Sequence, residues 1–171
     1  DAFAHQAADA MKVSARFDAP RVTIVSSERD EDRVVVSIDL RKNDIIRIYD
    51  VLFPAQVLLE TDLYIREFLM RCGMNGPVST AEFHYALGRD LIERQPGCEQ
   101  YSIVAAAAAT GVPLYTSSPG DSSIGMNVAF HELMNDSRLM IDPSKDVNEV
   151  CSFILAGKKN GCVILGGGSP K

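Results

Sequence analysis

The sequence contains no apolar run that approaches the roughly 18 residues of a membrane-spanning helix, and no segment resembles a signal peptide. Basic residues are few, because 17 Lys and Arg stand against 23 Asp and Glu and leave a formal net charge of −6. Nucleic-acid binding requires a concentrated Lys and Arg surface, which an acidic chain supplies poorly. We therefore expect a cytoplasmic protein with no nucleic-acid or membrane partner, whose acidic character suits a cationic small molecule.

Motifs of several enzyme and metal-binding classes are absent too. The four cysteines form no C-x-x-C pair, which favours reduced thiols over a zinc site or a disulfide framework. The three histidines share no metal-ligand spacing, so we expect packing or surface roles and no metal. The absence of a G-x-S-x-G elbow and of a P-loop disfavours a common α/β hydrolase and a P-loop nucleotidase. The residues concerned are Cys72, Cys98, Cys151, Cys162, His5, His84 and His131.

The first half of the chain combines helical and strand patterns. The composition, 46% hydrophobic over 171 residues, is that of one globular domain able to bury a core. Apolar periodicity predicts the helices, and β-branched runs predict a hairpin whose charged residues 28–32 form a solvated turn. Pro54 is expected to end or redirect the segment before it, and Thr80 to cap a helix. The expected elements are a helix over 2–17, hairpin strands over 21–26 and 33–40, a helix over 57–72, a loop over 73–77 and a helix over 81–92.

The second half alternates helices with short strands. Gly111 is the expected C-cap of the first helix, and Asp142-Pro143-Ser144 begins the last one. Repeated strand and helix units indicate an α/β fold, a parallel sheet covered by helices, with ligands at the carboxyl ends of the strands. The expected helices span 102–110, 123–135 and 143–156, and the expected strands span 112–115, 138–141 and 161–165, the last of them buried.

Two turns in this half are candidate ligand sites. Residues 117–127 place hydroxyls, glycines and the Asp121 carboxylate at a helix start, where backbone N–H groups point outward and a carboxylate can bind a ribose. Capping of the helix by Asp121 or Ser122 explains the same pattern equally well. Residues 163–168 run from a strand into three glycines, which suits either close approach of a ligand or a flexible turn.

Three carboxylates fall on one face of the last helix. Asp142, Asp146 and Glu149 follow an i, i+4, i+7 spacing. They form either a cation-binding edge or an acidic helix start that complements the helix dipole.

Several segments together resemble the deoxyhypusine synthase and homospermidine synthase family, above all its bacterial deoxyhypusine synthase-like branch. The resemblance covers residues 43–171 and leaves 1–42, the N-terminal helix and hairpin, unassigned. It implies a Rossmann-like fold, incomplete in this chain, a homotetramer with active sites between paired subunits, and bound NAD. The segments are residues 48–53, 105–113, 116–127, 141–149 and 163–171, with Ser-Ser-Pro-Gly-Asp-Ser-Ser-Ile-Gly-Met-Asn and Ile-Leu-Gly-Gly-Gly-Ser-Pro-Lys as the most specific.

The family resemblance also implies roles for individual residues. Asp121 matches an aspartate that contacts NAD and Gly167 a glycine beside it, so Gly166, Gly168 and Ser122 are expected at the cofactor as well. Lys171 matches a lysine near the polyamine. Met126 or Asn127 stands where deoxyhypusine synthases hold a spermidine amine with an aspartate, so Asn127 is the candidate substrate ligand here.

The resemblance implies that the family's imine-forming lysine lies beyond Lys171. No catalytic residue is therefore assigned within this sequence. We expect the chain to be a piece of a longer protein, and a protein ending at Lys171 to be unable to complete the transfer.

The expected function is NAD-dependent transfer of the aminobutyl group of spermidine to an acceptor amine, either a protein lysine or putrescine. One alternative is a regulatory or structural paralogue that keeps the fold and the oligomer interface without catalysis. Another is a related NAD-dependent enzyme that acts on a different amine, because Met126 departs from the family pattern.

Overall fold

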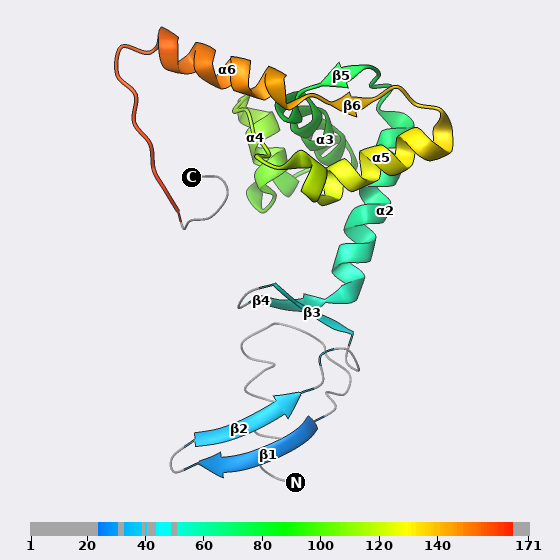
Figure 1. Cartoon of the computed structure of the whole chain (residues 1–171), viewed down its shortest axis with the longest axis vertical. Helices are drawn as coiled ribbons and strands as arrows, with labels where there is room; N and C mark the ends of the chain where they lie inside the picture. Colours follow the sequence, from blue (N-terminus) through cyan, green and yellow to red (C-terminus); the bar gives the residue numbers. More distant parts are fainter. Residues whose placement is uncertain (1–23, 31–32, 39, 41–43, 49–50, 166–171) are drawn as a thin grey trace. The chain divides into compact units, whose positions relative to one another are not determined.

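The computed structural model describes residues 24–30, 33–38, 40, 44–48 and 51–165 (Figure 1). The chain divides into two compact units, Asp1–Thr61 and Asp62–Lys171. The helix predicted over residues 2–17 lies outside the described residues.

The first unit contains two antiparallel hairpins. Strand β1 (Ile24–Asp30) pairs with β2 (Arg33–Ile38), which confirms the predicted hairpin. The predicted charged turn was too long, because its first three residues belong to β1, where Glu28 pairs with Val35 and Asp30 with Arg33. Their backbone groups join the ladder opposite a run of valines, and the ladder's N–H and C=O groups pair whatever the side-chain charge.

The second hairpin leads directly into a long helix. Strand β3 (Ile45–Ile48) pairs with β4 (Val51–Pro54), with Ile45 opposite Pro54. Helix α2 (Ala55–Arg71) starts at the residue after Pro54, two residues earlier than predicted. Proline cannot donate a backbone hydrogen bond and favours such boundaries, so Pro54 redirects the chain as expected.

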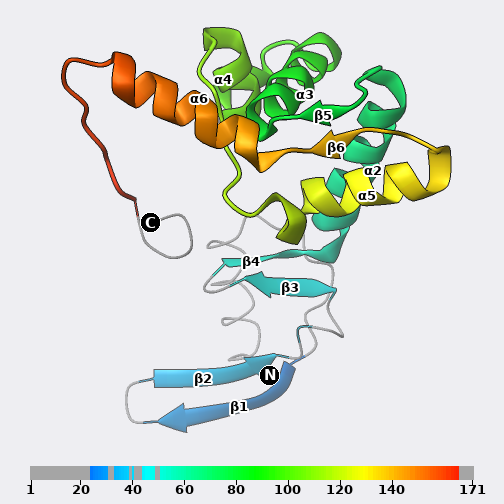
Figure 2. The ribbon, with the colours of Figure 1, turned by 45° about the horizontal axis from the view of Figure 1, so that its top comes forward.

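The second unit is mostly helical (Figures 1 and 2). Its core lies where α2 meets α3, and the edge-to-face contact of Phe68 with Phe83, ring centroids 5.6 Å apart, is at its centre. Helices α3 and α4 approach closely at Gly88, where a Cβ atom would lie 2.5 Å from the Val104 carbonyl oxygen. Besides α2, the elements of this unit are β5 (Pro77–Val78), α3 (Thr80–Arg94), η2 (Cys98–Gln100), α4 (Ile103–Thr110), η3 (Pro119–Asp121), α5 (Ser123–Asn135), β6 (Met140–Ile141) and α6 (Pro143–Ala156).

An ionic cluster ties α2 to α3. The Asp90 carboxylate accepts hydrogen bonds from the Tyr64 hydroxyl at 2.7 Å and from the Arg71 guanidinium at 2.8 Å. Partial burial acts to raise the pKa of the Asp90 carboxyl, but the bonds from Arg71 and Tyr64 outweigh it and hold that pKa below its usual range.

Most helix ends follow the predicted signals. Ser102 caps α4, Gly111 closes it with φ +70°, and α5 and α6 span the predicted residues. The predicted N-cap Thr80 is wrong, because Ser79 caps α3: its Oγ accepts from the Glu82 N–H at 2.9 Å, and the Glu82 carboxylate accepts from the Ser79 N–H at 2.7 Å. This reciprocal pair is a capping box, and its Ser-x-x-Glu pattern is visible in the sequence.

The α/β class is confirmed only in its coarse form, a mixed and mostly helical arrangement with small sheets. In the described part of the chain, one parallel pair is present: β5 with β6, joining Pro77 to Met140 and Val78 to Ile141. A Rossmann-like parallel sheet is not confirmed. Among the described helices, none has the length and apolar character needed to cross a bilayer.

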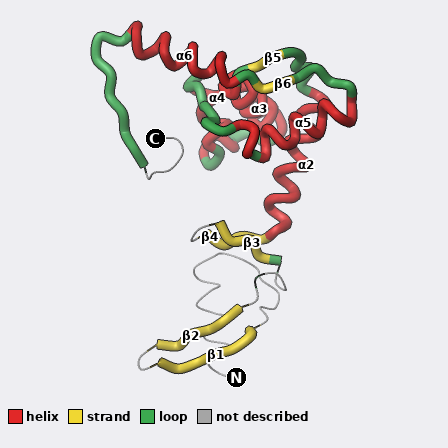
Figure 3. The backbone as a smooth tube through the Cα atoms, viewed as in Figure 1, coloured by secondary structure: helices red, strands yellow, loops and turns green. Residues whose placement is uncertain are grey.

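Two predicted strands are absent. Residues 112–115 form a loop between α4 and α5, and residues 161–165 form an extended segment after α6 (Figure 3). The second was expected to be buried, yet Val163 is 86% and Leu165 92% exposed. A strand requires a hydrogen-bonded neighbour, and neither segment pairs with any of the described strands.

Candidate functional site

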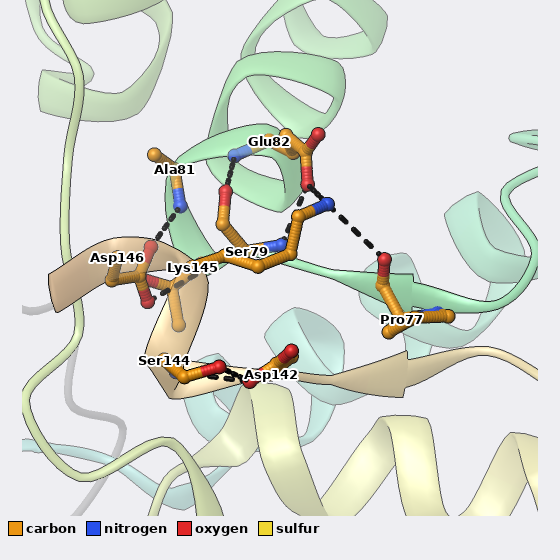
Figure 4. A network of polar contacts seen from close by, with 9 residues as sticks. Pro77, Ser79, Ala81, Glu82, Asp142, Ser144, Lys145 and Asp146 are labelled. Atoms are coloured by element: carbon orange, nitrogen blue, oxygen red, sulfur yellow. Dashed lines mark hydrogen bonds and ion pairs between the residues drawn. The ribbon is translucent and has the colours of Figure 1, made fainter. Parts of the chain in front are cut away.

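The start of helix α3 is held by a carboxylate from another helix (Figure 4). Asp146 of α6 is 7% exposed and its oxygens accept three hydrogen bonds: from the Thr80 N–H at 3.1 Å, the Thr80 hydroxyl at 2.8 Å and the Ala81 N–H at 3.2 Å. The first N–H groups of a helix have no partner within it and carry partial positive charge. A buried anion is therefore well placed at this helix start, and α6 is fixed against α3.

A second contact between α6 and α3 lies on the surface. The Lys145 ammonium contacts the Glu82 carboxylate at 2.6 Å and donates to the Pro77 carbonyl at 3.2 Å. The bond from Lys145, helped by the Ser79 backbone N–H, lowers the pKa of the Glu82 carboxyl. Figure 4 shows Lys145 reaching across from α6 toward Glu82 and Pro77.

The loop of residues 112–116 is anchored by side chains of α3 and α6. Thr80 accepts a hydrogen bond from the Thr116 N–H at 3.0 Å, and His84 Nδ1 lies 2.9 Å from the Leu114 carbonyl oxygen. A carbonyl can only accept, so Nδ1 carries the proton in this bond. The Tyr115 hydroxyl donates to Glu149 at 2.8 Å, and burial together with this carboxylate raises the pKa of Tyr115 to about 12.

The predicted cofactor turn follows this loop. Ser122 is the N-cap of α5: its Oγ accepts from the Gly125 N–H at 3.2 Å and donates to the Pro119 carbonyl at 2.7 Å. A Cβ atom on Gly125 would lie 1.9 Å from the Pro119 carbonyl oxygen, so this position requires glycine. The turn is therefore closed tightly onto the first residues of α5.

Asp121 is left available by this arrangement. It is exposed, and its carboxylate makes no hydrogen bond or ion pair with any residue that the structure describes. Of the two residues that could have capped α5, Ser122 does so and Asp121 does not. The carboxylate thus lies at the start of a 13-residue helix and binds none of the residues in the described ranges.

Asn127, the candidate substrate ligand, is buried at 2% exposure. Its amide nitrogen donates to Asp62 and to the Ser123 carbonyl, each at 2.8 Å, and its oxygen accepts from Arg66 Nε at 2.8 Å. These bonds join α2 to α5 and occupy the groups that would bind a ligand. The neighbouring Met126 is 60% exposed.

The three carboxylates on α6 each have a separate structural partner. Asp142 caps α6, accepting from the Ser144 N–H at 2.9 Å, and the Ser144 hydrogen bonds lower the pKa of the Asp142 carboxyl. Asp146 serves α3 and Glu149 binds Tyr115. These contacts favour helix capping and packing over a cation-binding edge. Within the described ranges, no group of three or more His, Cys, Asp or Glu side chains is arranged to hold a metal ion.

The remaining candidates lie outside the described residues: Gly166, Gly167, Gly168 and Lys171. The expected places of the three glycines at NAD and of Lys171 near the polyamine stay predictions. Sequence reasoning missed Thr80 as an anchor and Arg66 as the partner of Asn127. Both roles depend on residues more than 30 positions away, and no local pattern indicates them.

Comparison with known proteins matches residues 23–171 to the family described as deoxyhypusine synthase. This range starts before residue 43, where the sequence resemblance was placed. A deoxyhypusine synthase-like protein of Nostoc punctiforme is 49% identical over 140 residues, which are 78% of this chain and 36% of that protein. A probable deoxyhypusine synthase 2 of Methanosarcina mazei is 33% identical over 132 residues, 77% of this chain and 37% of the relative.

A more distant relative gives a similar picture. The probable deoxyhypusine synthase of Pyrococcus furiosus is 30% identical over 146 residues, 82% of this chain and 44% of that protein. The chain thus spans little more than a third of the length of its more similar relatives. Because the family match covers most of the sequence, the chain belongs to the deoxyhypusine synthase family.

Proposed function

We propose that this chain forms part of an NAD-dependent enzyme that transfers the aminobutyl group of spermidine to an acceptor amine. The family match supports the reaction class, since deoxyhypusine synthases are transferases. The observation that carries the proposal is the exposed Asp121 carboxylate, which has no partner among the described residues and which the resemblance matches to an aspartate that contacts NAD.

The residues around Asp121 fit a dinucleotide. A carboxylate accepts hydrogen bonds from ribose hydroxyls, and Gly120 leaves open space, because a Cβ there would have no described residue within 4 Å except its chain neighbours. No described residue accepts a hydrogen bond from the N–H groups of Ser123 and Ile124 at the start of α5. We propose that Asp121 and these N–H groups hold the cofactor, together with Gly166, Gly167 and Gly168. NAD would remove a hydride from the polyamine and return it.

The residues at the proposed amine position indicate the substrate less clearly than Asp121 indicates the cofactor. Met126 is apolar and Asn127 carries an amide, so neither residue supplies a carboxylate to an ammonium group, and the Asn127 amide is already bound by Asp62, Ser123 and Arg66. This observation favours a second candidate function, NAD-dependent transfer from an amine other than spermidine. A homotetramer with sites between paired subunits, and a protein acceptor, are further proposals from the family resemblance.

The cofactor is tested by titration calorimetry of NAD into the purified protein and its Asp121→Asn variant. Loss of a charge-assisted hydrogen bond of about 1.5–3 kcal/mol raises the Kd roughly 10- to 150-fold. Glu132→Gln is the matched control, because it removes the same charge from an exposed position on α5. An unchanged Kd for Asp121→Asn would contradict the assignment, and a wild-type protein that binds no NAD would favour the non-catalytic paralogue.

The donor amine is tested by incubating the protein with NAD and one amine at a time, spermidine or putrescine, and measuring diaminopropane and NADH. Diaminopropane from spermidine supports cleavage of the aminobutyl group, the first half of the transfer. NADH formation with putrescine alone supports the second candidate.

A further inference from the structure

The loop that carries the chain from α4 to the Asp121 turn has no sheet to hold it. Residues 112–116 form no strand, so their positions depend on hydrogen bonds from neighbouring helices. The backbone bond closest to the turn is that of Thr116, whose N–H donates to Thr80 at 3.0 Å.

The Thr80 hydroxyl is oriented for this bond from the opposite side. It is fully buried and donates its proton to Asp146 at 2.8 Å, which leaves its lone pairs to accept from Thr116. Asp146 is itself fixed by the N–H groups of Thr80 and Ala81. The hydroxyl therefore has one orientation in which both bonds are made.

A short, bonded path leads from Thr116 to Asp121. The Asp121 N–H donates to the Ser118 carbonyl at 3.2 Å, and Ser122 closes onto the Pro119 carbonyl at 2.7 Å. Pro119, in the middle of this turn, is buried. The turn is held by the Thr116 hydrogen bond on one side and by Ser122 of the α5 cap on the other. Displacement of Thr116 would move the end of this turn that α5 does not hold.

From these contacts we infer that Thr80 is a positioning residue: its hydroxyl, oriented by Asp146, places the Asp121 turn for cofactor binding. The expected effect of Thr80 on NAD affinity rests on the proposed function. The placement of the turn itself does not depend on NAD. His84, through the Leu114 carbonyl, supports the same loop from one helical turn further along α3.

The test is Thr80→Val, which keeps the shape of the side chain and the Thr80 N–H bond to Asp146 but removes the hydroxyl. Amide hydrogen exchange is measured without ligand at Thr116 and Asp121, and NAD affinity by calorimetry. We expect exchange at both amides to accelerate at least about tenfold and the NAD Kd to rise about five- to tenfold, as for one lost hydrogen bond.

Two controls separate positioning from general stability. Thr80→Ser restores the hydroxyl and should restore both the exchange rates and the Kd. Ser79→Ala removes the cap of the same helix without touching the loop, so it should lower the unfolding midpoint while leaving exchange at Thr116 and Asp121 unchanged. If Thr80→Val does not fold, Thr80→Ala, which also removes the hydroxyl and keeps the Thr80 N–H bond to Asp146, is measured in its place.

Unchanged exchange at Asp121 in a folded Thr80→Val protein would overturn the inference. So would accelerated exchange with an unchanged Kd in a protein that binds NAD, because the turn would then be loosened without consequence. If the wild-type protein binds no NAD, the proposed function fails, and exchange at Asp121 alone decides whether Thr80 positions the turn.

Discussion

Replacing Asp146 with alanine should be the most damaging single change at the start of α3. The substitution removes the acceptor of three hydrogen bonds and leaves the Thr80 N–H, the Thr80 hydroxyl and the Ala81 N–H without their partner. Thr80 is fully buried and Ala81 is 7% exposed, so water reaches these groups poorly.

The magnitude follows from the charge and burial of the carboxylate. A hydrogen bond to a charged group contributes about 1.5–3 kcal/mol, but three bonds to one carboxylate are not additive, and the Thr80 hydroxyl can rotate after the change. A buried donor left without its partner costs about 1–3 kcal/mol, so three such donors lead us to expect about 3–5 kcal/mol for Asp146→Ala. This is a large share of the 5–15 kcal/mol that stabilises an ordinary domain.

The assay is urea unfolding of the purified protein followed by circular dichroism at 222 nm. Ser79→Ala is the matched control, because it removes one neutral cap at the same helix start and should cost about 1 kcal/mol. Asp146→Asn keeps the shape and one acceptor oxygen but turns an NH₂ group toward backbone donors, so its effect should lie between the two. If Asp146→Ala destabilises the protein no more than Ser79→Ala, the three bonds do not hold α6 to α3 as described.

Three further changes test other parts of the second unit. Gly125→Ala should destabilise the protein by at least about 2 kcal/mol in urea unfolding, because the new Cβ would overlap the Pro119 carbonyl. Gly120→Ala is the control, because its Cβ meets open space and should have less effect. Equal effects of the two variants would contradict this packing. The pKa of Asp90 is lowered in the folded state, so the unfolded state binds more protons in acid. The stabilisation by Asp90 is therefore full above about pH 5 and is lost as the pH falls through the folded pKa. Asp90→Asn should therefore flatten the fall in unfolding midpoint below pH 5, and an unaltered acid profile would refute this. Tyr115 should ionise near pH 12 in a spectrophotometric titration. Because its folded pKa is raised, the stabilisation by Tyr115 is present below about pH 10 and lost as the pH rises through 12. Tyr115→Phe should remove this step from the titration, and a titration curve unchanged by the variant would contradict the assignment.

Elements with local signals were predicted well from the sequence. Helix α5 begins after Ser122 and α6 after Asp142, and both capping residues bind backbone N–H groups of their own helices. The end of α4 at Gly111 is local too, since its φ of +70° suits glycine. The error at Thr80 arose from choosing one hydroxyl of an adjacent pair, where the Ser-x-x-Glu pattern ending at Glu82 already favoured Ser79.

Elements that depend on distant partners were predicted poorly. Residues 112–115 and 161–165 are mostly apolar, as buried strands are, but composition does not provide the neighbour that a strand must pair with. The loop obtains its hydrogen bonds from Thr80 and His84 of α3 instead. The parallel pair that does form uses Pro77–Val78, and Pro77 is the last residue of the segment 73–77 that was expected to be a loop.

The acidic face of α6 shows which contacts at the site could be predicted from the sequence and which could not. Periodicity correctly places Asp142, Asp146 and Glu149 on one face, because i, i+4 and i+7 positions lie together on a helix. The helix-dipole interpretation holds for Asp142, which caps its own helix. Asp146 serves the dipole of α3, and Glu149 accepts from a tyrosine in the loop before the Asp121 turn. A shared face thus predicts that residues point the same way, while the packing of α6 against α3 and the loop decides what each one binds. For that reason the candidate cofactor residue could be found from local pattern and resemblance, but the residues that position it required the structure.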